Sequence, residues 1–166
     1  MRLRVLVAVM VAALALVPTP AEAKGAKDVT VSGPGLATPI RFDNGGDFGG
    51  SANRLWQASG LLVQTPDRVT PNVPQKGALG PRYLATFQWL VGPQETAPIR
   101  QELYPFADAG AVSYTPPRQR GLHVPFRSGW YRAGPELTLL LVAAGVPVPA
   151  GYAAPASVAA QPPLAG

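Results

Sequence analysis

The chain has 166 residues, of which 47% are hydrophobic and 14% are charged, and its formal net charge is +5 at pH 7. It contains no cysteine and one histidine, His123. These counts exclude disulfide bonds, thiolate nucleophiles, cysteine-ligated metal centres and cysteine-linked lipids, together with metal sites that need two histidines. A chain of this length without disulfides predicts one domain that is stabilised by an ordinary hydrophobic core.

The first 23 residues have the features of a secretory signal peptide. Two arginines precede an apolar run from Val5 to Val17, prolines end this run, and Ala21 and Ala23 are the small residues that a signal peptidase reads. The run is shorter than the roughly 20 residues that a membrane-spanning helix needs. We therefore expect cleavage after Ala23, a secreted protein, and no transmembrane segment in the mature chain.

Two alternating segments follow a short basic lead. Residues 28–32 and 38–42 place apolar side chains at every second position, which is the pattern of half-buried strands. The turn Gly33-Pro34-Gly35 between them is too short for a crossover helix, so we expect an antiparallel pair.

Residues 43–50 contain four glycines, which predict a loop. Ser51 is expected to cap a helix that includes Leu55, Ala58 and Leu62, because their spacing is helical.

The two acids of this loop, Asp43 and Asp47, suggest a calcium site, but the EF-hand pattern fails at Gly45, Phe48 and Arg54. We interpret the segment as a glycine turn capped by aspartates. The sequence predicts no metal ligand and no cofactor.

The clearest strand is predicted at 82–91, and we expect it to be central in the sheet. One of its faces carries Tyr83, Ala85, Phe87 and Trp89. Before it, repeated prolines make 63–81 an irregular connection. After it, the runs 98–104 and 111–115 predict a hairpin, because the turn formers Asp108 and Gly110 lie between them.

The C-terminal third is predicted to be irregular at 116–134, and a helix then starts with Pro135 in its first position. Residues 137–144 are apolar on all sides, which predicts a buried helix that packs against the sheet. Residues 146–166 contain five prolines and no charged residue, which predicts a flexible tail.

These elements define the expected architecture. We expect an α+β domain at residues 24–145, with a small antiparallel sheet of about five strands and two short helices. A signal peptide at 1–23 precedes the domain, and a Pro/Ala-rich flexible tail at 146–166 follows it.

One region combines positive charge with aromatic rings and contains no acid. Its candidate binding residues are Arg118, Arg120, Arg127, Trp130, Tyr131 and Arg132. Guanidinium groups fit phosphate and carboxylate, and Trp and Tyr rings stack on sugars, so the region is a candidate anion- or glycan-binding surface. The alternative, which charge runs more often support, is a solvated loop that Trp130 anchors to the core.

The sequence contains no recognisable catalytic set. A Ser-His-acid triad through His123 would lack the Gly-x-Ser-x-Gly elbow, and the acids are spread singly along the chain. We therefore lean against an enzyme. The alternative is a secreted hydrolase of cell-wall glycans or esters that uses two carboxylates or His123.

Three stretches, VSGPGLATPIRF at 31–42, IRQELYPFADAGAVSYTPP at 99–117 and GWYRA at 129–133, resemble small secreted proteins of high-GC Gram-positive (actinobacterial) bacteria. The resemblance implies export and assigns no activity to any residue. We expect a non-catalytic secreted binding or cell-envelope-associated protein that uses the basic, aromatic loop. Anionic cell-wall polymers or lipid headgroups are the expected partners, and nucleic acid is not.

Overall fold

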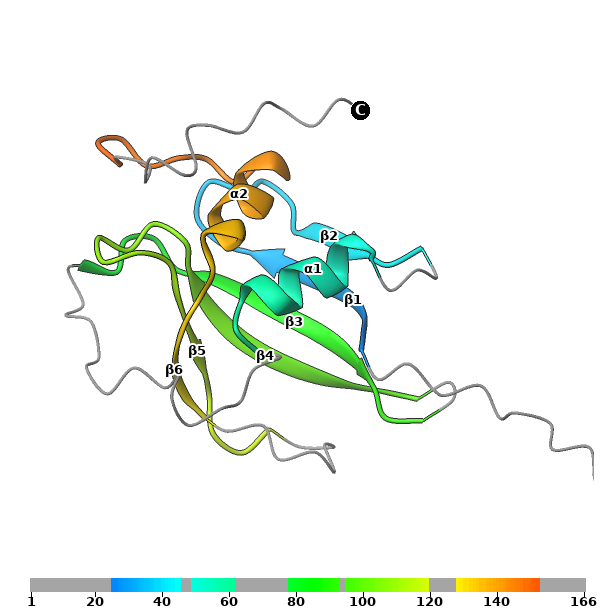
Figure 1. Ribbon diagram of the computed structural model, residues 1–166. Helices are drawn as coiled ribbons and strands as arrows, with labels where there is room; N and C mark the ends of the chain where they lie inside the picture. The colour runs from blue at the N-terminus through cyan, green and yellow to red at the C-terminus, as the bar shows by residue number, and fades with distance from the viewer. Residues whose placement is uncertain (1–24, 46–48, 62–77, 93–94, 120–127, 153–166) are drawn as a thin grey trace, which may run out of the picture.

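The computed structural model describes residues 25–45, 49–61, 78–92, 95–119 and 128–152. They form an α+β fold with one antiparallel sheet in the order β2-β1-β3-β4-β5-β6 and two helices (Figure 1). The elements are β1 (Ala26–Ser32), β2 (Ile40–Asp43), α1 (Ser51–Ala58), β3 (Tyr83–Leu90), β4 (Thr96–Tyr104), β5 (Val112–Thr115), β6 (Gly129–Arg132) and α2 (Pro135–Ala143). The predicted fold class is confirmed, with six strands instead of about five. The predicted signal peptide lies outside the described residues.

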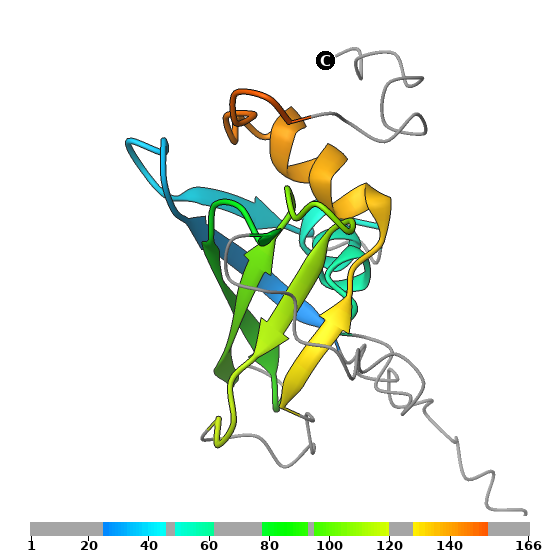
Figure 2. The same ribbon diagram turned by 90° about the vertical axis from the view of Figure 1, so that its left-hand side faces the viewer.

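The two faces of the sheet differ because the side chains of each strand alternate between them. In β3, Tyr83, Ala85, Phe87 and Trp89 are all at most 5% exposed, and they point to the side that carries both helices. Figure 2 shows the two helices on the same side of the sheet. The predicted central strand, the hairpin of β1 with β2 and the hairpin of β4 with β5 are confirmed.

Helix α1 covers β1 and β2 and buries Leu55 and Trp56 in the core. The Trp56 ring meets the Trp89 ring edge-to-face at a centroid distance of 4.7 Å. The N-cap is Gly50, so the prediction that Ser51 caps the helix is wrong by one position. A residue outside the helix supplies the capping oxygen, because Asn44 Oδ1 accepts a hydrogen bond from the Asn53 amide at 2.9 Å.

Helix α2 starts with Pro135 in its first turn, as predicted, and its Gly134 N-cap is extended. Leu137 and Leu141 are fully buried, whereas Val142 is 36% exposed. The prediction of a helix buried on all sides is therefore wrong: α2 packs one side against the core and leaves apolar side chains on the other side in solvent.

The predicted irregular segment at 116–134 contains strand β6, which pairs with β5 in antiparallel register. Four residues are too few for an alternating pattern to be recognised among prolines and arginines.

The buried part of the chain also extends past the predicted boundary at Gly145. Val146 is 2% exposed, and the Tyr152 ring packs edge-to-face on Phe106 at 4.9 Å.

Strand β4 is longer than β5, which pairs only with residues 102–104. Two features cover the unpaired part of this edge. Pro98 has no amide donor, and the side chain of Gln119 pairs with the backbone of Arg100. The Arg100 amide donates to Gln119 Oε1 at 2.6 Å, and Gln119 Nε2 donates to the Arg100 carbonyl at 2.7 Å. The Gln119 side chain thus makes the two hydrogen bonds to Arg100 that the backbone of a neighbouring strand would otherwise make.

Candidate functional site

The face of the sheet opposite the helices, called the outer face, carries three neighbouring aromatic rings. The centroid of Trp130 on β6 lies 5.0 Å from that of Tyr114 on β5 and 5.5 Å from that of Tyr104 on β4. The strand register explains this contact, because Tyr114 pairs with Trp130 on one side and with Glu102 on the other. Tyr104 is buried, while Tyr114 and Trp130 are half-buried and pack against a small buried cluster that contains Leu79, Tyr104, Ala107 and Val112.

Glu102 connects this aromatic cluster to a positive charge. Its carboxylate accepts a hydrogen bond from the Tyr104 hydroxyl at 2.7 Å and forms an ion pair with Arg82 at 3.2 Å. Burial raises the pKa of Tyr104 to about 12, aided by the hydrogen bond to Glu102 and the negative charge of that carboxylate, while Arg82 acts in the opposite direction. The Tyr104 hydroxyl is therefore a neutral donor at physiological pH.

Two arginines of the outer face lie on either side of the row formed by Glu102, Tyr114 and Trp130. Arg132 lies two residues after Trp130 on β6, and Arg100 lies two residues before Glu102 on β4. Because side chains alternate along a strand, both arginines share the face of this row and lie at its opposite sides. Both side chains are exposed, and neither forms an ion pair within the part of the chain that the structure describes.

The structure brings together only some of the predicted binding residues. Trp130 and Arg132 share the outer face, and Arg118 is exposed with a left-handed backbone (φ 58°). Tyr131 points to the opposite face and is 1% exposed, so the prediction that its ring could stack on a ligand is wrong. Arg120 and Arg127 lie outside the described residues.

Sequence reasoning missed Tyr104, Tyr114 and Arg100 as members of this surface. The predicted hairpin contained all three, and alternation alone would have placed Arg100 and Tyr104 on one face. Their contact with Trp130 depends on strand β6, which has no recognisable sequence pattern.

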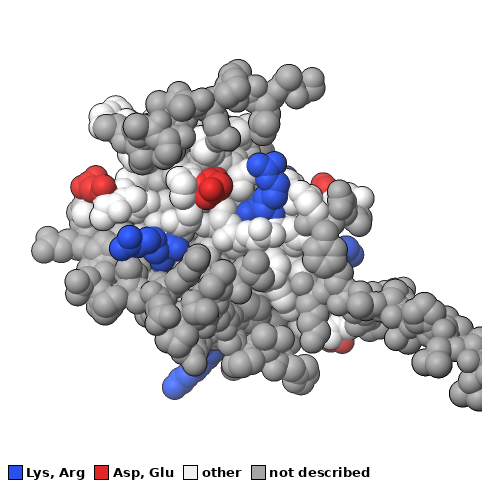
Figure 3. Space-filling view, in the orientation of Figure 1, with Lys and Arg blue, Asp and Glu red and all other residues white. Residues whose placement is uncertain are grey.

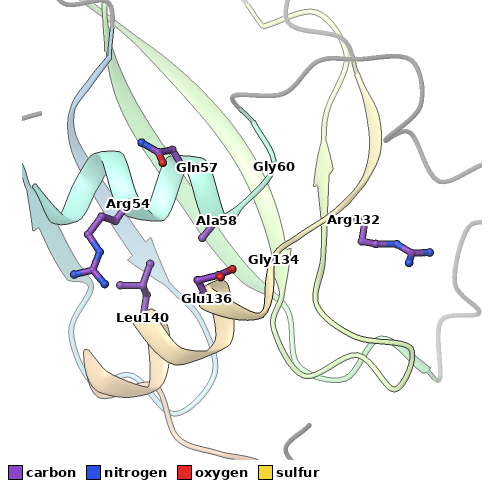
Figure 4. A pocket seen from close by; sticks show the side chains of 8 residues that line it. All are labelled: Arg54, Gln57, Ala58, Gly60, Arg132, Gly134, Glu136 and Leu140. Atoms are coloured by element: carbon purple, nitrogen blue, oxygen red, sulfur yellow. The ribbon is translucent and has the colours of Figure 1, made fainter. Parts of the chain in front are cut away.

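On the helix side, a hollow of about 340 Å³ lies between α1, the end of β6 and the start of α2 (Figure 4). Its lining residues are Arg54, Gln57, Ala58, Gly60, Arg132, Gly134, Glu136 and Leu140. Glu136 is the one carboxylate among them. Figure 3 shows that the charged side chains of the described residues visible on this side of the molecule lie singly.

Within the described ranges, no group of three or more His, Asp or Glu side chains could hold a metal ion. Asp43 Oδ1 accepts a hydrogen bond from the Gly45 amide at 3.1 Å, which is an ordinary turn contact. None of the helices found in these ranges has the length and apolar character of a bilayer-crossing segment. Asp47 and His123 lie outside them.

Comparison of the chain with protein-family models, with curated proteins and with solved structures finds no match.

Proposed function

We propose that this protein is a non-catalytic, secreted binding protein that associates with the cell envelope through the outer face of its sheet. The observation that carries the proposal is the half-buried pair of Trp130 and Tyr114, flanked by the guanidinium groups of Arg100 and Arg132, which form no ion pair with any described residue. Aromatic rings stack on sugar rings, and guanidinium groups bind phosphate or carboxylate. This combination fits an anionic glycan polymer of the cell wall.

Secretion is part of the same proposal. It is supported by the signal-peptide features of residues 1–23 and by the resemblance to secreted actinobacterial proteins. The basic net charge agrees with a polyanionic partner, because a positive protein accumulates near negative polymers.

The hydrolase alternative receives less support from the described residues. A glycosidase needs two carboxyl groups that face one substrate, roughly 5–10 Å apart. The hollow on the helix side offers one carboxylate, Glu136. On the outer face, Asp28 and Glu102 are each engaged by an arginine, and Asp43, which lies opposite Asp28 in the register, accepts a hydrogen bond from the Gly45 amide.

The test is a sedimentation assay of the purified protein with purified cell walls over a series of salt concentrations. We expect binding that weakens as salt rises, since the charges are exposed and screened. The double variant Arg100→Gln/Arg132→Gln should bind several-fold more weakly and keep its stability, because both side chains are solvated.

A matched control removes the same charge elsewhere. Lys27→Gln/Arg54→Gln changes two exposed cations on β1 and α1, away from the aromatic cluster, and should bind like the parent. If both double variants lost the same amount of cell-wall binding, the interaction would depend only on net charge, which would contradict the proposed surface. Binding to anionic lipid vesicles but not to cell walls would replace the glycan by a lipid headgroup.

A further inference from the structure

The hollow on the helix side contains opposite charges that do not neutralise each other. Arg54 and Gln57 are exposed on one side of α1, and Glu136 is exposed in the first turn of α2. No ion pair joins Glu136 to Arg54 or Arg132 in the described chain. Figure 4 shows the Arg54 side chain beside Leu140, while the Glu136 side chain extends toward Gly134. The positive and negative groups thus occupy different parts of one hollow.

The floor of the hollow is fixed by backbone contacts between distant segments. The Gly134 amide donates a hydrogen bond to the Ala58 carbonyl at 2.9 Å, which joins the end of α1 to the start of α2. Gly60 has φ +78°, and a Cβ on it would lie 3.2 Å from the Arg132 carbonyl oxygen. A side chain at position 60 would therefore be strained and crowded, so the glycine lets the backbone after α1 lie close to the Arg132 carbonyl.

Gly134 has a second role, which concerns the acidic group. A Cβ at this position would lie 2.4 Å from Glu136 Oε2. The absence of a side chain therefore lets the carboxylate lie across the start of α2, where the positive end of the helix dipole favours a negative charge. Ala58 and Leu140 add apolar surface beside it.

From these features we infer that the hollow is a binding site for a small zwitterion of the α-amino acid class. The ligand ammonium group would meet Glu136, its carboxylate would meet Arg54 and Gln57, and an aliphatic side chain would contact Leu140 and Ala58. A volume of about 340 Å³ is at the small end of the range for ligand pockets, which fits a free amino acid or the end of a short peptide. A dianion is disfavoured because Glu136 would repel it.

The probe is L-leucine, and the measurement is a titration of the purified protein followed by the backbone amide signals of Ala58, Gly60 and Gly134 in NMR spectra. We expect saturable shifts of these signals with L-leucine. N-acetyl-L-leucine lacks the ammonium group and L-leucinamide lacks the carboxylate, so each should bind roughly five- to tenfold more weakly.

Two variants assign the contacts. Glu136→Gln should remove the preference for L-leucine over N-acetyl-L-leucine, and Arg54→Gln should remove the preference over L-leucinamide. Glu95→Gln changes an exposed acid in the turn between β3 and β4 and should behave like the parent. None of these residues belongs to the outer face, so the outcome is independent of cell-wall binding.

Two results would overturn the inference. They are the absence of saturable shifts with L-leucine and equal responses of the parent protein to all three probes.

Discussion

Gln101 on β4 and Ser113 on β5 form a hydrogen bond inside the hydrophobic core, with 2.9 Å between Nε2 and Oγ and no exposure of either side chain. Ser113 Oγ in turn donates to the Ser59 carbonyl at 2.7 Å, just after α1 ends. Gln101 Nε2 also donates a hydrogen bond to Thr115 Oγ1 at 3.3 Å, whereas Gln101 Oε1 has no hydrogen-bond partner among the described residues. The cluster therefore joins the end of α1 to the middle of the sheet through polar contacts.

The first prediction concerns this cluster. Ser113→Ala should lower the free energy of unfolding by about 1–3 kcal/mol, because it removes the closest donor to a buried carbonyl and the closest acceptor of Gln101 Nε2. Urea denaturation measures the change. Ser32→Ala, on the half-buried outer side of β1, is the control and should change stability by less than about 0.5 kcal/mol. Equal midpoints for the two variants would show that the buried cluster contributes nothing.

The second prediction follows from the one-sided burial of α2. Leu141→Ala should cost about 2–5 kcal/mol, because it leaves a cavity at a fully buried position. Val142→Ala is the neighbouring control and should cost far less, since Val142 is 36% exposed. Thermal unfolding distinguishes them. Similar losses at both positions would mean that the exposed side of α2 is covered in solution.

The third prediction concerns the open edge of β4. The double variant Pro98→Thr/Gln119→Ala restores a backbone donor at position 98 and frees the amide and carbonyl of Arg100. Such an edge can pair with another chain, so we expect concentration-dependent self-association by light scattering. Hydrogen exchange of the Arg100 amide should already be faster in Gln119→Ala alone. An unchanged exchange rate would contradict the role of Gln119 as a substitute for a strand.

The fourth prediction uses the raised pKa of Tyr104, which is about 12 in the folded protein against an ordinary value of 10. Since the folded state favours the neutral hydroxyl, Tyr104 contributes stability that is fully present below pH 10 and is lost as the pH rises toward 12. Burial also raises the pKa of Tyr83, so part of the alkaline loss belongs to that residue.

Tyr104→Phe separates the two contributions. Its stability should fall less steeply than that of the parent between pH 10 and 12. Glu102→Gln should lower the pKa of Tyr104, because it removes the negative charge beside the hydroxyl. Spectrophotometric titration of tyrosinate in the two variants is the measurement. Identical titration curves for parent and Glu102→Gln would contradict this assignment.

The sequence predicts those elements whose local pattern of apolar residues and end signals matches the way they are buried in the fold. Strand β3 is long and alternates without a break, and α2 starts with a Gly-Pro-Glu signal, so both were predicted to within a few residues. The cap of α1 could not be predicted, because its oxygen comes from Asn44, several residues before the helix. The exposure of Val142 could not be predicted either, since the helix sequence is apolar on every side and the burial depends on what α2 contacts.

The candidate surface was predicted only where it is local in sequence. Trp130 and Arg132 were named from a run of arginines and aromatic residues, and that run placed Tyr131 with them. In the strand, side chains alternate between the two faces of the sheet, so Tyr131 points into the core while its two neighbours do not. Tyr104 and Tyr114 lie beside Trp130 because of the register between β4, β5 and β6, and a local sequence pattern does not determine how separate strands pair.

The hydrogen bond between the Gly134 amide and the Ala58 carbonyl also bears on the order in which the chain folds. It closes a long loop, and the entropy of closing such a loop has to be offset by contacts formed at the same time. β3 and β4 are close in sequence and pair along their whole length, so we expect them to form early. α1 and α2 contact each other and both contribute to one hydrophobic core. A chain that stops before Pro135 would leave part of that core exposed to other chains, so we expect it to aggregate more readily than the full chain.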